Sequence, residues 1–307
     1  MLQEYAVEPA AIGSDWQTFR YLIEKFGFDQ GRLISQFPKH WFREVYQAAG
    51  GLSDLQKKRV EEALNEAKKN KVVRTGRPYN PDLGGWLDNA LAEHGREPFH
   101  AIIAAANPGG DACVVCSDEA DDGHALMACA RERAVPRDVE SLAAALQGML
   151  RFGARVVFVD PFFDPYKALH KRVFLRLLTI VKDLNPRAEC EIHYRYHANK
   201  PDNADLEGEA AALFGDIIPA GMAVTLYCWK ERDGGEDFHA RYLLTDKGGI
   251  RVDAGFEPVG DHQNTDVSLM DFDLSQMRLA ALARNATEYE LVGPVLRISA
   301  GGEVAHV

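Results

Sequence analysis

The residues best suited to do chemistry in this chain are a histidine, an arginine and an aspartate with the spacing H-x-R-x4-D. His239, Arg241 and Asp246 form this pattern within the segment DFHARYLLTDKGGIRVDAG. The segment alternates like a β-strand, which predicts that His239, Arg241 and Leu243 point to one face. An imidazole can attack phosphorus or transfer a proton, and a guanidinium can hold phosphate oxygens. Asp246 is placed to orient the imidazole by accepting its other N–H, so the pattern predicts a phosphate-handling site.

Glycines after the pattern predict a hairpin. The chain turns at residues 247–249 and returns as Ile250-Arg251-Val252, which is typical of two short antiparallel strands.

H-x-R-x4-D resembles the H-x-K-x4-D signature of the phospholipase D superfamily, which includes phospholipases, nucleases and non-catalytic relatives. The resemblance covers about residues 152–299. It implies a nucleophilic role for His239, phosphate binding by Arg241 and a supporting role for Asp246. It also implies a two-fold homodimer, because catalytic members use two copies of the motif and this chain has one.

The sequence departs from that signature at two places. Arginine stands where the family has lysine, which keeps the charge and changes the geometry. The family's G-S/G-x-x-N tail is replaced by VDAGFE at residues 252–257. A His-x-Arg before a hairpin also resembles, more distantly, the non-catalytic phospholipase-D-like domain at the C-terminus of some MIT-domain proteins.

Two further segments contain candidate substrate-binding residues. Asp160 follows an apolar strand, where ligand clefts form in α/β sheets, whereas Asp164 better fits a helix cap before Pro165. His193, Arg195 and His197 would share one strand face over a phosphate path. Glu191 on the same face would allow a metal site, which the arginine disfavours, and the alternative is a partly exposed strand face.

Acidic and thiol groups offer weaker candidates. Asp253 and Glu257, followed by Asp261 and Asp266, would border the site or form a solvated acidic loop. Cys113, Cys116, His124 and Cys129 have the ligand types of a zinc knuckle but no standard spacing. Small buried cysteines are the alternative, and no metal or other cofactor is expected.

Composition predicts a globular protein of the cytoplasm. The 307 residues are 46% hydrophobic and 26% charged. The net charge of −11 argues against a protein whose whole surface is basic and binds nucleic acid. Residues 51–80 are nevertheless net positive. They predict a local basic surface, and the alternative is that these charges only solvate an exposed helix.

No apolar run approaches the roughly 20 residues of a membrane span. The first residues do not resemble a signal peptide, and five cysteines fit a reducing compartment.

Hydrophobic periodicity predicts how these residues are positioned. Residues 1–95 have helical patterns at 16–26, 29–36, 40–49, 55–71 and 86–94. Residues 96–307 alternate strands with helices, which predicts an α/β domain with a mixed sheet, phospholipase-D-like by the resemblance. The expected strands are 99–106, 112–117, 154–159, 189–196, 222–229 and 295–299, and the expected helices are 141–152, 166–184, 206–214 and 275–286.

Two functions follow as hypotheses. The first is a metal-independent phosphodiesterase, most directly a nuclease that forms a phosphohistidine, with partner proteins in bacterial defence. The second is a non-catalytic module that holds nucleic acid, another phosphate ligand or a partner protein on the same cationic face. A phospholipid-surface module is a third hypothesis, opposed by the negative charge.

Overall fold

A computed structural model describes residues 1–307, except that the side chain of Asp261, one of the acidic residues considered above, lies outside the described part. The chain divides into two compact units, Met1–Arg131 and Glu132–Val307. The expected division at residues 95/96 therefore falls at 131/132. The difference arises because the strand expected at 99–106 pairs with a strand at the start of the chain, and the strand expected at 112–117 pairs in turn with the one at 99–106.

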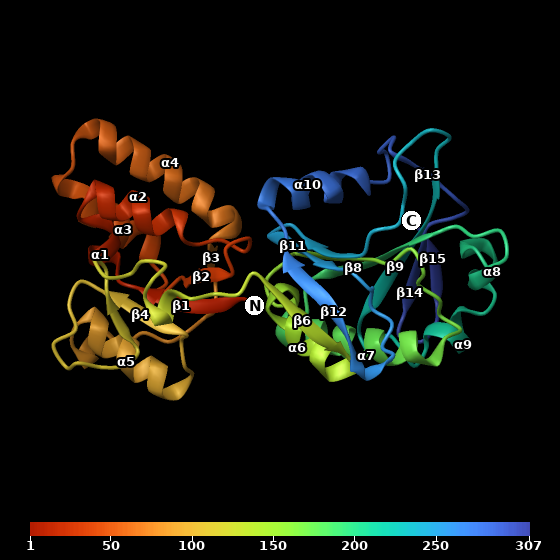
Figure 1. Ribbon diagram of the computed structural model, residues 1–307, viewed down its shortest axis with the longest axis horizontal. Coiled ribbons are helices and arrows are strands. Elements are labelled where there is room, and N and C mark those ends of the chain that lie inside the picture. Colours follow the sequence, from red (N-terminus) through yellow and green to blue (C-terminus); the bar gives the residue numbers. More distant parts are fainter. The chain divides into compact units, whose positions relative to one another are not determined.

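The first unit is an α/β unit and not a purely helical region (Figure 1). Its five strands are all parallel, in the order β3-β2-β1-β4-β5. The strands are β1 (Gln3–Val7), β2 (Arg32–Ser35), β3 (Val72–Val73), β4 (Ala101–Ala104) and β5 (Val114–Cys116). The helices are α1 (Pro9–Gly13), α2 (Trp16–Glu24), α3 (Trp41–Ala48), α4 (Asp54–Asn70) and α5 (Trp86–Arg96).

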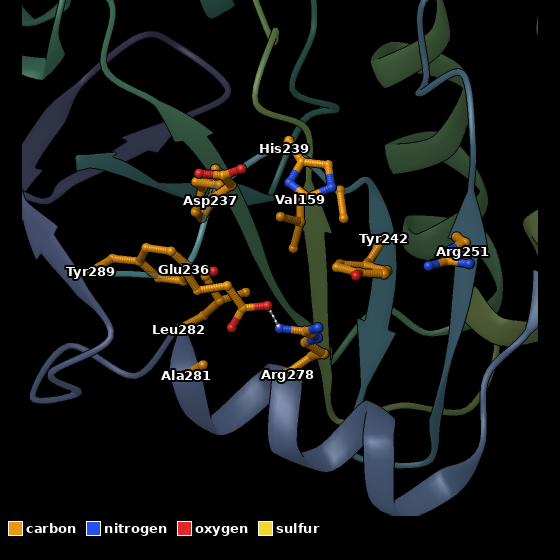
Figure 2. Close-up of a pocket in the computed structure, with 12 residues that line it drawn as sticks. Val159, Glu236, Asp237, His239, Tyr242, Arg251, Arg278, Ala281, Leu282 and Tyr289 are labelled. Carbon is orange, nitrogen blue, oxygen red and sulfur yellow. Dashed lines mark hydrogen bonds and ion pairs between the residues drawn. The ribbon is translucent and has the colours of Figure 1, made fainter. Parts of the chain in front are cut away.

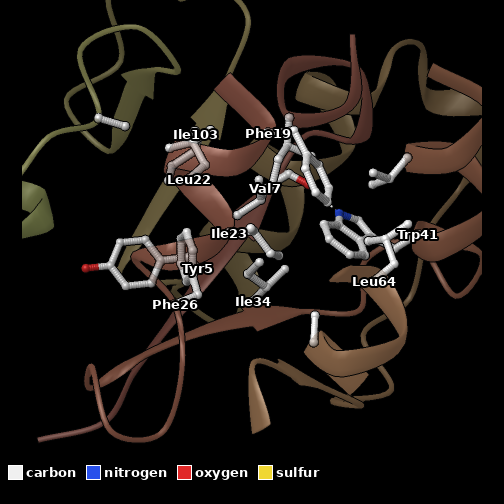
Figure 3. Packing of buried hydrophobic residues seen from close by; sticks show 14 of the residues in the cluster. Tyr5, Val7, Phe19, Leu22, Ile23, Phe26, Ile34, Trp41, Leu64 and Ile103 are labelled. Atoms are coloured by element: carbon white, nitrogen blue, oxygen red, sulfur yellow. Dashed lines mark hydrogen bonds between the residues drawn. The ribbon is translucent and has the colours of Figure 1, made fainter. Parts of the chain in front are cut away.

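Residues 29–36, expected to be helical, contain strand β2. Leu33 and Ile34 are buried there. A short strand that is covered on both faces has an apolar run without alternation, so its sequence does not distinguish it from a helix. Figure 3 shows the core against which β1 and β2 pack, with Tyr5, Ile34 and Trp41 inside it. The indole N–H of Trp41 donates to the carbonyl of Val7 at 2.7 Å, which satisfies its buried polar atom.

The second unit contains a ten-stranded mixed sheet in the order β15-β14-β9-β8-β7-β10-β11-β12-β6, with β13 paired to β9. The α/β class expected from the sequence is confirmed. Strands β7, β8 and β9 are parallel, and β10 and β11 form the expected hairpin, in which β10 pairs antiparallel with β7. The strands are β6 (Glu132–Arg137), β7 (Arg155–Val159), β8 (Glu189–Arg195), β9 (Ala223–Glu231), β10 (Tyr242–Thr245), β11 (Gly248–Val252), β12 (Gly260–Leu269), β13 (Tyr289–Leu291), β14 (Leu296–Ser299) and β15 (Val304–His306).

Helices cover both faces of this sheet (Figure 1). Helix α10 lies on one face and α6 and α7 lie on the other. The bounds are α6 (Val139–Leu150), α7 (Ala168–Leu184), α8 (Asn203–Glu207), α9 (Ala210–Phe214) and α10 (Phe272–Ala281). Asp138 caps α6, since its carboxylate accepts from the N–H of Ser141 at 2.8 Å. No helix among the described residues is both long enough and apolar enough to cross a membrane.

Candidate functional site

The candidate site lies at one edge of the sheet in the second unit. Parallel strands β7, β8 and β9 end at this edge, and β10 begins there because it runs antiparallel to β7. Tyr242, the first residue of β10, pairs with Val159, the last residue of β7. Asp160 and Arg241 therefore follow as neighbours just beyond the sheet. This arrangement brings together segments that are far apart in the sequence.

Asp160 is buried and organises the loops around it. Its carboxylate accepts from the backbone N–H groups of Phe162 at 2.9 Å and of Phe256 at 3.2 Å, and its own N–H donates to the carbonyl of His193. Gly255 has a φ of +78°, and a Cβ there would lie 3.0 Å from the Asp160 carboxylate and 3.4 Å from Arg241. Glycine thus lets the loop pass between both side chains. Asp160 shapes the site and does not project into solvent.

Three cationic or titratable side chains lie against the ring of Phe162. The guanidinium carbons of Arg241 and Arg195 lie 4.9 and 5.4 Å from the ring centroid. The ring of His197 stacks on Phe162 at 5.9 Å with an interplanar angle of 27°. We call Phe162, Arg195, His197 and Arg241 the Phe162 cluster. Two guanidinium groups on one partly exposed ring form a surface that attracts an anion.

Neighbouring acceptors hold the two arginines in place. Arg195 donates to the carboxylate of Glu231 at 3.1 Å, and Arg241 donates to the backbone carbonyl of Asp253 at 3.1 Å. Each of these hydrogen bonds uses Nη1 of its guanidinium. A guanidinium has further N–H groups, and these can donate to phosphate oxygens.

His239 is exposed beside this cluster, in the segment that leads into β10. Phe238 and Ala240 pack into the core together with Tyr242. Strand β10 begins only at Tyr242, so His239 and Arg241 lie in the segment before the strand and not on a strand face as expected. The N–H of Phe238 donates to Glu231 at 2.8 Å, which anchors the segment. No hydrogen bond joins the His239 ring to another described residue. The imidazole is therefore accessible to a ligand.

Asp246 does not orient His239. It lies in the turn between β10 and β11, at the other end of a four-residue strand, or roughly 13 Å of chain. Its carboxylate accepts from the backbone N–H of Ala154 at 2.6 Å and of Arg155 at 3.4 Å. The expected contact with the imidazole is absent, and Asp246 instead ties the hairpin to the start of β7.

His193, expected to bind substrate, is fully buried in a polar network. The indole N–H of Trp229 donates to its Nδ1 at 2.9 Å, so the neutral ring carries its proton on Nε2 and donates to Glu191 at 2.8 Å. Arg155 donates to both oxygens of Glu191. Burial lowers the pKa of His193. The pKa of Glu191 falls to about 2, because hydrogen bonds from His193 and Arg155 outweigh the opposing effect of burial. His193 is a structural residue.

Glu191→Ala should lower the free energy of unfolding by about 3 kcal/mol, because it leaves the imidazole N–H and the Arg155 guanidinium without their acceptor. Glu207→Ala is the control, since Glu207 forms an exposed pair with His306 and its loss should cost less than about 1 kcal/mol. Urea unfolding of both variants measures the difference. Equal effects would contradict the structural role of the network.

The acidic residues after the motif lie away from the Phe162 cluster. The exposed carboxylate of Asp253 lies 3.9 Å from Arg251. Glu257 pairs with Lys167 at 3.0 Å, and its carboxylate lies 4.0 Å from Nε2 of the buried His170. Only the backbone carbonyl of Asp253 contacts the Phe162 cluster, through Arg241. Neither the Asp253 side chain nor the Glu257 side chain therefore has the substrate-binding position expected from the sequence.

Beside His239 lies a pocket with a volume of about 110 Å³ (Figure 2). Its walls come from β7, β10, β11, β13, helix α10 and the segment before β10. Glu236 pairs there with Arg278 of α10. The residues that line it are Val159, Glu236, Asp237, Phe238, His239, Ala240, Tyr242, Arg251, Arg278, Ala281, Leu282 and Tyr289.

The possible zinc ligands are not gathered into a metal site. The Cys129 thiol contacts the carbonyls of Met1 and Gly31, and burial raises its pKa. His124 accepts from the N–H of Leu126 at 3.2 Å. Among the described residues, no group of three or more His, Cys, Asp or Glu side chains is arranged to hold a metal ion.

The basic segment of residues 51–80 is neutralised only in part within the first unit. Lys69 pairs with Glu66, and Lys57 lies 3.9 Å from Asp54. Arg77 is buried among acidic partners that include Glu4. The exposed cations of this segment are Lys58, Arg59, Lys68, Lys69 and Arg74.

Comparisons with known proteins leave the site as the main guide to function. No protein-family model and no curated protein sequence matches the chain. A solved structure that matches is TrmBL2, an archaeal chromatin protein, described as showing a novel mode of DNA binding. The identity is 12%, the match covers 83% of this chain and 72% of that chain, and the TM-score is 0.28. Similarity at that level carries no argument about this chain.

Phe162 and Glu231 are site residues that sequence reasoning missed. The aspartates of the segment DPFFDP are the residues that its sequence makes conspicuous, yet the exposed aromatic ring of Phe162 between them organises the arginines. An aromatic residue directly after a strand that ends in aspartate is a weak signal, because nothing local shows which side chains will meet its ring.

Proposed function

We propose that this chain is a phospholipase-D-like phosphodiesterase that cleaves nucleic acid without a metal ion. The observation that supports it most is the Phe162 cluster, in which two guanidinium groups and His197 surround one ring beside the exposed His239. Fixed cations can neutralise the charge that develops on phosphate oxygens. The cluster supplies this charge from side chains alone.

The proposed reaction has two steps. A ring nitrogen of His239 attacks phosphorus, the bond from phosphorus to the leaving sugar oxygen breaks, and that oxygen takes a proton from protonated His197. Water then attacks the phosphohistidine and gives a proton to His197, and the phosphorus–nitrogen bond breaks to restore His239. Arg195 and Arg241 hold the non-bridging oxygens throughout. His197 would thus supply within one chain the second histidine that the resemblance assigned to a partner subunit.

This mechanism predicts an acidic pH optimum. His197 donates through Nε2 to the carbonyl of Pro161 at 3.3 Å. Partial burial lowers its pKa, and nearby Arg195 and Lys200 add to this effect, whereas the bond to Pro161 and the charge of Glu231 oppose it. The protonated form needed in the first step is therefore lost as pH rises through a value below the ordinary 6.5. Turnover should peak below about pH 6.5, and His197→Ala should remove the fall on the basic side of the profile.

Cleavage should also persist in a chelator. We expect purified protein to cleave single- or double-stranded nucleic acid, or a generic phosphodiester, equally fast with and without EDTA. Fluorescence release from a doubly labelled oligonucleotide measures the rate. Activity that disappears with EDTA and returns with magnesium would contradict the mechanism.

A non-catalytic phosphate-binding module is the second candidate. The observation that favours it is that no described residue forms a hydrogen bond with the His239 ring, because an activated histidine normally has a carboxylate or carbonyl on its other nitrogen. This candidate predicts oligonucleotide binding that weakens with salt and no turnover at any pH. The chelator assay therefore separates the two functions.

The remaining parts of the proposal concern assembly and setting. We propose a two-fold homodimer, partner proteins in bacterial defence and a cytoplasmic location. Light scattering tests the dimer, and a monomer with full turnover would overturn it.

A further inference from the structure

The pocket beside His239 differs from the Phe162 cluster in the chemistry of its walls. Its walls combine apolar or aromatic residues, among them Phe238, Leu282 and Tyr289, with charged side chains. Figure 2 shows the carboxylate of Glu236 facing the guanidinium of Arg278, and the two groups form an ion pair. The pocket therefore offers flat apolar surface together with a fixed acceptor and a fixed donor.

Its volume limits what it can hold. At about 110 Å³ it lies well below the roughly 300–1,000 Å³ of sites that enclose whole drug-sized ligands. One planar ring system is the size of group that fits, and a complete nucleotide does not. Any larger ligand must therefore extend out of the pocket past His239.

The charges of the pocket limit the occupant further. Two carboxylates, Glu236 and Asp237, line it together with two guanidinium groups, Arg251 and Arg278, so the fixed charges balance and favour neither an anion nor a cation. The occupant is therefore neutral. A carboxylate only accepts hydrogen bonds and a guanidinium only donates them, so the matching edge has N–H donors beside a carbonyl acceptor.

The pocket and the Phe162 cluster both include neighbouring residues of the same segment. His239 lines the pocket, and Arg241, two residues further along, lies over Phe162. Two residues of extended chain span roughly 7 Å. A group in the pocket can therefore belong to the same ligand as a phosphate on Arg241.

We propose that this pocket binds the guanine base of a nucleotide whose phosphate lies on the Phe162 cluster. Guanine carries two adjacent N–H donors beside a carbonyl oxygen on its pairing edge, which match Glu236 and Arg278. Adenine, cytosine and uracil lack that combination. Reading a base through its pairing edge and enclosing it between aromatic and apolar side chains is a general mode of recognition. The proposal rests on the proposed function and gives it a preference for guanine.

Isothermal titration calorimetry with four probes tests the pocket and the cluster separately. Guanosine tests the pocket alone, ribose 5-phosphate tests the cluster alone, and GMP and AMP test both together. GMP should bind about tenfold more tightly than AMP or ribose 5-phosphate, as expected for one two-bond contact to a base. Glu236→Gln should abolish this preference and leave ribose 5-phosphate binding unchanged. The control is Glu288→Gln, because Glu288 is exposed and does not line the pocket.

The outcomes distinguish the two proposals. Equal affinity for GMP, AMP and ribose 5-phosphate would overturn the guanine pocket and leave the phosphate site standing. Guanosine binding that depends on Glu236, without any binding of ribose 5-phosphate, would support the pocket and overturn the phosphate site. A preference for GMP that survives Glu236→Gln would also overturn the assignment, as would the absence of all binding.

Discussion

His239→Ala should reduce phosphodiester turnover by a factor on the order of 10³ or more, because it removes the group proposed to form the covalent intermediate. Stability should change by no more than about 0.5 kcal/mol, since the side chain is exposed and bonds to no other described residue. Initial rates on an oligonucleotide and a thermal melt measure the two effects.

The matched control is His306→Ala, because His306 of β15 is also exposed and its imidazole contacts Glu207 of α8. Its turnover should equal that of the unmodified protein. Turnover retained in His239→Ala would exclude the nucleophile assignment. A clearly lowered melting temperature with activity intact would show that His239 contributes to packing.

Arg241→Ala should reduce turnover by about 10²–10³-fold, because it removes a fixed cation from the phosphate oxygens as the bond to His239 forms. Arg241→Lys should retain part of the activity, since lysine supplies the charge as a point without the two-pronged grip. The contact with Phe162 is also weakened in both variants. Rates for the two variants, with Arg176→Ala as an exposed control on α7, measure the effect.

The non-catalytic candidate predicts a different pattern for the same variants. Both substitutions would then weaken oligonucleotide binding in graded fashion, and no variant would turn over substrate. Equal turnover in the unmodified protein and Arg241→Ala would show that this arginine does not hold the phosphate, and the site assignment would fall with it.

Local pattern alone determined several features of this protein. The alternating pattern was enough to predict a strand that ends near Asp246, which the structure shows as β10, and the glycines at 248–249 were enough to predict the hairpin. The α/β class also followed from the order of apolar segments. These features depend on the two-residue period of a strand and on turn residues, which act over short distances along the chain.

Tertiary structure alone decided which residues share a site. Phe162, Arg195 and Arg241 come from three separate segments, and they meet because parallel β7 and β8 end at the edge where antiparallel β10 begins. His193 and His197 look alike in the sequence, yet Trp229 and Tyr227 bury the first and the second lies beyond the strand. Asp246 is close to His239 in sequence and distant in space because an extended strand separates them. Burial and strand order arise from contacts between distant segments, so no local pattern contains them.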